Sequence, residues 1–190
     1  MPTIITHTVV AVAAGKAFTK GPMPRNFWRA AIVSSVIADG DVLAFFFGIP
    51  YAHFFGHRGF FHSIFFAFML SIALASIFWK HARPFSRQWW QYFLFFFLVG
   101  SSHGILDAMT DGGLGIALLS PFDNHRYFFP WTPIVVSPIG LSGFFSHWGL
   151  MVMISEITYV WAPLLICLFV IRMSIHKFCK QALITTVHDY

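Results

Sequence analysis

Five stretches of this chain are almost wholly apolar, and short polar or Gly- and Pro-containing segments separate them. The stretches run over residues 3–18, 27–47, 60–79, 89–109 and 147–172. About 20 apolar residues in a helix cross the roughly 30 Å hydrocarbon core of a bilayer. The pattern therefore predicts an all-α fold, a multi-pass integral membrane helical bundle with about five transmembrane helices. The first stretch, about 24 Å long as a helix, is a little short of that thickness.

Residues 112–145, between the fourth and fifth stretches, follow a different pattern. Glycines and prolines alternate through this segment, which excludes a long regular helix. The segment nevertheless remains apolar and aromatic. We expect an irregular re-entrant or cap segment against the membrane, because non-helical backbone at that depth must be satisfied by protein or water. The whole chain, 1–190, is predicted to form a single membrane-embedded domain.

Composition and charge support this interpretation and add an orientation. The chain is 57% hydrophobic and 10% charged, whereas soluble domains carry about 25% charged residues. Most of its 12 basic residues fall at one end of the five-helix arrangement, and these are Lys16, Lys20, Arg25, Arg29, Lys80, Arg83, Arg87, Arg172, Lys177 and Lys180. The positive-inside rule places that end, with the C-terminus, in the cytoplasm. Because these residues lie between and beyond the apolar runs, the net charge of +5 does not indicate nucleic-acid binding.

A polar motif ends the fourth apolar stretch. His103, Asp107 and Asp111 are spaced i, i+4, i+8, which stacks their side chains along one helical face. Each ionisable group at membrane depth costs about 2.5–3.5 kcal/mol on insertion scales and usually marks function. An imidazole one turn from a carboxylate is suited to hold a divalent cation. The alternative is a His–Asp hydrogen bond that only neutralises two buried groups.

Two further motifs fall toward the same end of the predicted bundle. Asp39 and Asp41 would point about 200° apart on a regular helix, but Gly40 permits a local break that could bring both to one cation. The alternative is a pair of carboxylates facing a wet cavity. His57 and His62 straddle a predicted helix start, where they can converge, and Arg58 with the free amides of that turn would suit an anion such as phosphate. The alternative here is an interfacial loop without chemistry.

The residue types at this end indicate which metal would bind. His7 and Glu156 add a further imidazole and a carboxylate, although a histidine near a helix start is more often a polar partner than a ligand. Histidine and carboxylate without suitably placed cysteine favour zinc, with manganese as the alternative. The number of candidate ligands allows one or two ions, and two metals suit the hydrolysis of phosphoesters.

These motifs resemble those of a bacterial family, the membrane-bound, predicted metal-dependent hydrolases of the YdjM type. The matching pieces are Thr6-His7 with Gly15, Asp39-x-Asp41, His57-Arg-Gly-x-x-His62-Ser63, His103-x-x-x-Asp107-x-x-Thr110-x-x-Gly113, Pro121-Phe122, Arg126-Tyr-Phe-Phe-Pro130, Ser137-Pro-Ile-Gly140 and Ser155-Glu156. Together they cover most of the chain. The resemblance implies a multi-pass protein of the bacterial inner membrane with metal-dependent hydrolase activity.

The expected function is a membrane-embedded metal-dependent hydrolase. Its substrate would be a lipid or lipid-linked molecule, such as a phosphoester, reached from the extracytoplasmic half of the bilayer. The expected metal ligands are His57, His62, His103 and Asp107, followed by Asp39, Asp41 and His7. Asp111 or Glu156 would act as general base, and Arg58 would bind the substrate anion. The alternatives are a metal-ion transporter and a regulatory membrane protein that use the same cluster; the apolar cytoplasmic half favours the enzyme.

Overall fold

The computed structural model describes residues 1–19, 21–78 and 83–174. Within these ranges the α-helices are α1 (Ile4–Phe18), α2 (Arg25–Val36), α3 (Ile64–Phe78), α4 (Arg87–Ala108), α5 (Leu141–Phe144) and α6 (His147–Glu156). Two 3₁₀-helices, η1 (Ile37–Phe47) and η2 (Phe60–His62), and a π-helix, η3 (Ile157–Trp161), complete the elements. The predicted all-α fold is therefore confirmed over the described residues, where β structure is limited to two isolated bridges. The predicted end of the third stretch at residue 79, and the basic residues Lys20, Lys80, Lys177 and Lys180, lie outside them.

The predicted number of five transmembrane helices is not confirmed. Two described helical segments, Arg25–Phe47 and His147–Ser174, are long and apolar enough to cross a membrane. The helices Ile4–Phe18 and Ile64–Ile77 are apolar but shorter. Helix α4 has 22 residues and is not among the candidate spans, and polar side chains such as Ser101, His103 and Asp107 occupy its C-terminal part. The polar residues of the site thus lower the mean hydropathy of the helix that carries them.

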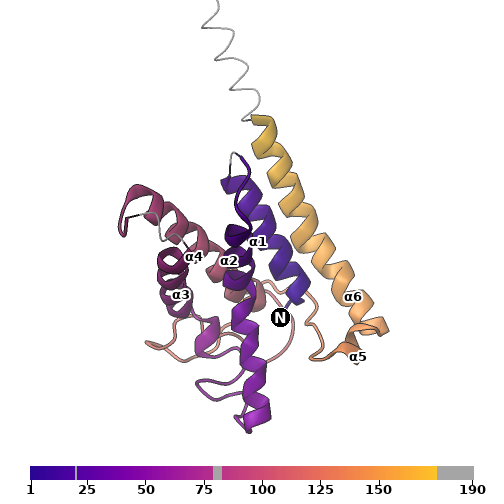
Figure 1. The fold of residues 1–190 in the computed structure, drawn as a ribbon. Coiled ribbons are helices and arrows are strands. Elements are labelled where there is room, and N and C mark those ends of the chain that lie inside the picture. Colours follow the sequence, from indigo (N-terminus) through magenta and orange to yellow (C-terminus); the bar gives the residue numbers. More distant parts are fainter. Residues whose placement is uncertain (20, 79–82, 175–190) are drawn as a thin grey trace, which may run out of the picture.

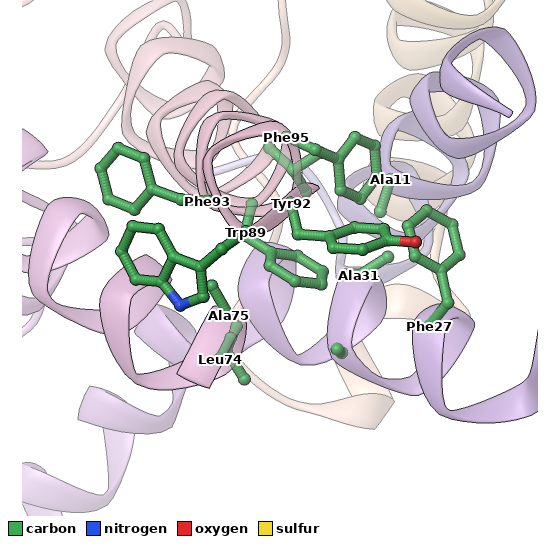
Figure 2. Close-up of a cluster of buried hydrophobic side chains, with 12 residues drawn as sticks. Ala11, Phe27, Ala31, Leu74, Ala75, Trp89, Tyr92, Phe93 and Phe95 are labelled. Carbon is green, nitrogen blue, oxygen red and sulfur yellow. The ribbon is translucent and has the colours of Figure 1, made fainter. Parts of the chain in front are cut away.

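Aromatic and small side chains pack α1, α2, α3 and α4 together at the end distant from the polar motifs (Figure 2). Phe27 of α2 stacks on Phe95 of α4, with ring centroids 5.0 Å apart, and Trp89 stacks on Phe93 at 5.6 Å. The remaining members of this core are Ala11, Ala30, Ala31, Leu74, Ala75, Tyr92, Phe96 and Val99. Alanine lets the helix backbones approach closely, while large rings fill the space between them. Apolar residues therefore fill this half of the bundle.

Helix α2 changes into η1 without a break in the chain. Runs of 3₁₀-helix longer than three or four residues are uncommon and often mark a functional segment; η1 has 11 residues. With 3.0 residues per turn, Asp39 and Asp41 point about 120° apart measured the short way round, less than on an α-helix. A side chain that lies between them can therefore contact both carboxylates.

The last long helix changes its winding at its middle. The π-helical turn η3 directly precedes Ala162 and Pro163, after which the chain remains helical to Ser174. Proline lacks an N–H donor and its ring displaces the carbonyl four residues earlier, and a local π-turn accommodates both effects. Figure 1 shows this helix beside α1, and Trp161 Nε1 donates a 2.7 Å hydrogen bond to Thr6 Oγ1 across that contact.

The segment between α4 and α6 is irregular over residues 109–140, with α5 as its one short described helix. Backbone hydrogen bonds attach it to the rest of the molecule. Ala117 N donates to Arg58 O (3.1 Å), Ile64 N donates to Leu118 O (3.0 Å), and Ser137 N donates to Met1 O (2.9 Å). The segment therefore covers the end of the bundle at which α1 begins and α4 ends.

Candidate metal centre

Residues from four elements that are distant in the sequence meet at one end of the bundle. His7 comes from the first turn of α1, Asp39 from η1, His62 from η2, and His103 and Asp107 from the C-terminal part of α4. The opposite ends of these helices carry basic residues, for example Lys16 at the end of α1 and Arg87 at the start of α4. The alternating directions of the helices (Figure 1) thus place these acidic and histidine side chains at the end opposite to Lys16 and Arg87.

Four side chains form the centre of this group, and all four are buried. They are Asp39, His62, His103 and Asp107, each with one ligand atom within 4.8 Å of the others. His62 Nε2 lies 3.2 Å from Asp107 Oδ2 and 3.6 Å from Asp39 Oδ1. His103 Nε2 lies 3.5 Å from Asp39 Oδ1 and 3.7 Å from Asp107 Oδ2. Two imidazole nitrogens and two carboxylates thus point at one common space.

The ligand atoms of this group have no hydrogen-bond partners. Both oxygens of Asp39 and of Asp107, and the Nε2 atoms of His62, His103 and His7, are buried without one. His7 Nε2 lies 3.3 Å from Asp107 Oδ1, and the His7 ring stacks on His103 with centroids 3.9 Å apart. Buried polar atoms are costly unless paired, and a cation held by Asp39, His62, His103 and Asp107 would pair one atom of each. The residues therefore fit a divalent metal ion.

Groups outside this centre hold the two central imidazoles in orientation. His103 Nδ1 lies 2.7 Å from the carbonyl oxygen of Ser35, so the Nδ1–H tautomer leaves Nε2 free for an ion. His62 Nδ1 lies 3.0 Å from Asp41 Oδ2, although without a hydrogen-bond angle. Outer carboxylates and carbonyls of this kind fix the ring and raise the basicity of the ligating nitrogen. The imidazole of His62 thus lies between the two carboxylates of η1.

A second group of possible ligands, Asp41, His57 and His62, adjoins the first. The two oxygens of Asp41 already have partners: Oδ1 is 2.6 Å from His57 Nδ1, and Oδ2 accepts from Arg58 N at 3.0 Å. An ion at this position would have to compete with these contacts. The structure thus brings His57 and Asp41 together as a hydrogen-bonded pair beside the first group.

A glycine on α4 allows His62 and His103 to converge. A Cβ atom at Gly104 would lie 2.5 Å from the carbonyl oxygen of His62 and 3.1 Å from Leu118 Cδ2. The first contact is with backbone, which cannot rotate away. Any side chain at this position would therefore push η2 away from α4 and separate the two histidines.

We expect Gly104→Ala to lower metal affinity about 10-fold, or about 1.4 kcal/mol, because the ligands would no longer share one centre. The measurement is the dissociation constant of Zn²⁺ by competition with a chelating dye, on purified protein in nanodiscs. Gly21→Ala is the matched control, since a Cβ there meets nothing within 4 Å. Equal affinities of the two variants would contradict this role of Gly104.

Arg58 lies at the edge of the same group and is buried, with 1% of the residue exposed. Its Nη1 atom donates to Gly112 O at 2.5 Å and Nη2 donates to Thr110 Oγ1 at 3.1 Å, while Nε has no partner. A Cβ at Gly113 would lie 2.5 Å from Nη1, so the glycine makes room for the guanidinium. Among the described residues, no carboxylate forms an ion pair with Arg58. A buried cation without a counter-ion is suited to bind an anion.

The two carboxylates predicted as general bases lie in other surroundings. Glu156 is fully buried and accepts from Thr3 N at 2.5 Å, from Thr3 Oγ1 at 2.7 Å and from Thr6 Oγ1. It thereby caps the N-terminus of α1, one turn before His7. Asp111 follows the end of α4 at Ala108 and is exposed, with Oδ1 accepting from Val136 N at 2.8 Å. The structure does not bring either residue into the two groups of ligand atoms.

Three positioning groups were not predicted from the sequence. One is the Ser35 carbonyl, which as a backbone atom leaves no sequence signal. Another is Tyr51, whose ring packs edge-on against His57 at 5.2 Å. The third is Arg126, which donates to the carbonyls of His57 and Tyr51, both at 2.9 Å, and so holds the loop that carries Arg58. Two signals in the sequence single out Arg126: it lies away from the basic end of the predicted bundle, and it begins the motif Arg126-Tyr-Phe-Phe-Pro130.

Comparisons with known proteins identify the family of this chain. Residues 1–178 match the YdjM inner membrane protein family. The inner membrane protein YbcI of Escherichia coli (strain K12) is 38% identical over 163 residues, which are 86% of this chain and 92% of that protein. No solved structure matches the chain. The family resemblance indicated by the sequence motifs is confirmed, and the chain belongs to the YdjM family of inner membrane proteins.

Proposed function

We propose that this inner membrane protein is a metal-dependent hydrolase that acts on a lipid or lipid-linked phosphoester. The observation that carries the proposal is the set of buried imidazole nitrogens and carboxylate oxygens that share one space without hydrogen-bond partners. A cluster that served only to neutralise itself would use these atoms in hydrogen bonds with each other. The open arrangement instead favours an ion, and an ion beside an unpaired arginine favours an anionic substrate.

Asp39, His62, His103 and Asp107 would hold the ion, with His7 beside them. Their donor set favours zinc, with manganese as the alternative. A second ion at Asp41, His57 and His62 would have to displace the hydrogen bond between Asp41 and His57, so the proposal uses one ion. A bound divalent cation would supply a water of lowered pKa and polarise a phosphoryl oxygen. Four protein ligands fill a tetrahedral zinc site, so the proposed water requires an ion with five or six ligands.

Other side chains would handle the substrate. Arg58 would bind the phosphoryl oxygens through its unpaired Nε edge and balance the charge that develops during attack. We assign the proton-transferring role to His57 rather than to Asp111 or Glu156. Its Nδ1 atom is oriented by Asp41 at 2.6 Å, which leaves Nε2 to hold or move a proton. Glu156 instead anchors α1, and thereby His7.

The alternative, a metal-ion transporter, needs a polar path to the other face of the membrane. The described core at the distant end consists mainly of alanine, leucine, valine and aromatic side chains, and the hydroxyls of buried Ser34 and Ser71 donate to helix carbonyls. Ions cross such a region at a high cost in free energy. An apolar half combined with a buried unpaired arginine therefore favours the enzyme.

The test is an assay on the purified protein in nanodiscs that contain anionic glycerophospholipids. We expect release of a phosphorylated or dephosphorylated head group that requires Zn²⁺ or Mn²⁺ and stops on chelation. The parallel measurement is cation flux into sealed proteoliposomes. If the metal-loaded protein transports cations and hydrolyses none of these phosphoesters, the proposed function is wrong and the protein is a transporter.

Sidedness follows from the basic residues and is a separate prediction. A reporter fused after Tyr190 should be cytoplasmic, because most basic residues fall at that end. A cysteine introduced at exposed Asn124, in the loop at the site end of the bundle, should react with an impermeant maleimide added to intact spheroplasts. The reverse labelling pattern would place the site on the cytoplasmic face.

A further inference from the structure

Two cavities lie at this end of the bundle, one lined in part by the ligand Asp39 and the other by His57 and Arg58. The first, about 360 Å³, lies between the start of α1, η1 and the segment 137–144. Its walls are almost entirely apolar, with Ile5, Val42 and Phe144 among them, and it reaches Asp39. A volume of this size is within the range of small-molecule sites. One wall of the metal centre therefore faces an apolar chamber.

The second cavity, about 350 Å³, also has mainly apolar walls, but the guanidinium-bearing residue Arg58 is among the residues that line it. Tyr51, His57, Arg58, Gly113 and Trp148 line it. Arg58 is buried, and its Nε atom has no partner. Nearby Arg126 donates to backbone carbonyls and, like Arg58, forms no ion pair with a carboxylate among the described residues. Burial raises the pKa of Tyr51 to about 12, so its hydroxyl stays protonated.

The metal centre lies between these cavities. His62 Nε2 is 3.6 Å from Oδ1 of Asp39, which lines the first cavity. The ring centroid of His62 is 5.6 Å from that of His57, which lines the second cavity. The cavities also share a wall, made of Met1, Ser137, Pro138 and Ile139. A molecule with an apolar part and an anionic part would match both cavities. The bond that joins its two parts would then lie beside the metal ligands.

We propose that the two cavities form one bipartite site for an anionic amphiphile, with a single alkyl chain in the apolar cavity and an acidic phosphorus-containing head group in the cavity of Arg58. The inference rests on the proposed function for the cleavage of the bound molecule, but binding itself needs no hydrolysis. Charge complementarity favours an acidic head group, because a neutral one would leave the buried Arg58 guanidinium without an ion-pair partner. The apolar lining decides the chain, because a polar chain would lose its hydrogen bonds there.

The test uses photo-crosslinking with a dodecylphosphonate that carries a diazirine at its terminal carbon. The protein is held in phosphatidylcholine nanodiscs, and labelled residues are identified by mass spectrometry. We expect labels on the walls of the apolar cavity, at Ile5, Val42 or Phe144. Excess dodecylphosphonate should remove them, and dodecanol, which has the same chain without the acid, should not.

Matched variants separate the cavity from the general lipid-facing surface. Ile5 and Ile37 are 42% and 43% exposed, but only Ile5 lines the cavity. Ile5→Trp should reduce labelling about 10-fold by filling the chamber, and Ile37→Trp should not. Val42→Phe provides a second filled variant if Ile5→Trp does not fold. Arg58→Gln should weaken competition by dodecylphosphonate about 10-fold.

The outcomes distinguish this inference from the proposed function. Labelling is measured with and without Zn²⁺, so specific labelling without hydrolysis would leave the amphiphile site standing and remove the enzyme. Three results would overturn the bipartite site even if the protein hydrolyses another phosphoester. They are labels spread over exposed residues such as Leu165, competition by dodecanol equal to that by the phosphonate, and unchanged labelling in both filled variants.

Discussion

His103→Ala is expected to lower the bound divalent metal to near background while the protein still inserts into the membrane. His103 supplies one of the two central imidazole nitrogens, and its Nδ1 atom is fixed by the Ser35 carbonyl. Loss of an outer partner of a metal ligand typically costs 10- to 100-fold in affinity, so loss of the ligand itself should cost more than about 100-fold. Metal content per protein and competition with a chelating dye measure the effect.

The control for this substitution is His125→Ala, because the His125 side chain is 86% exposed in the loop after Asp123. A graded series adds detail. Asp107→Asn should resemble His103→Ala, whereas Asp41→Asn should cost about 10- to 100-fold, as expected for a residue that orients His62. If His103→Ala binds as much metal as the unmodified protein, the metal-site interpretation is wrong. The cluster would then only neutralise its own buried polar groups.

Arg58→Lys is expected to retain metal and fold but to lose about 10-fold or more in hydrolysis of an anionic lipid, about 1.4 kcal/mol of transition-state binding. Lysine keeps the charge but lacks the planar fork. In the structure this fork contacts Gly112 O and Thr110 Oγ1 at once and still leaves Nε free. A primary ammonium cannot reproduce both contacts and the free edge. The measurement is kcat and KM for the substrate identified in nanodiscs, with metal content determined on the same samples.

Arg29→Lys is the matched control, since Arg29 is exposed on α2 near the opposite end of the bundle. Its turnover should equal that of the unmodified protein. If Arg58→Lys hydrolyses the substrate as fast as the control, Arg58 is a structural loop residue and the anionic-substrate hypothesis fails.

The number of membrane-spanning helices is a property that the pattern of apolar residues predicts incompletely. Apolar runs predicted five helices, and the structure has helices in all five stretches, yet only two of the described segments meet the length and hydropathy of a span. The polar residues of α4 lower its hydropathy. The mean hydropathy of a sequence window is the same whether a polar side chain in it faces lipid or a metal centre.

The sequence alone determined the helical class, the family and most members of the polar group. Long apolar runs leave the backbone in lipid no alternative to helix, and the i, i+4 spacing places His103 and Asp107 on one face whatever surrounds them. These properties are local, so they survive without knowledge of the fold.

Only the tertiary structure decided which polar residues meet. Asp39, His62 and Asp107 are far apart in the chain and converge because η1 winds with three residues per turn and Gly104 admits the η2 backbone. Glu156 and Asp111 have the same chemistry as these ligands, but Thr3 and Val136 take up their oxygens. The reason is physical: a carboxylate binds whatever donors the packing brings to it, and packing between distant segments depends on volumes and backbone approach that spacing along one segment does not encode.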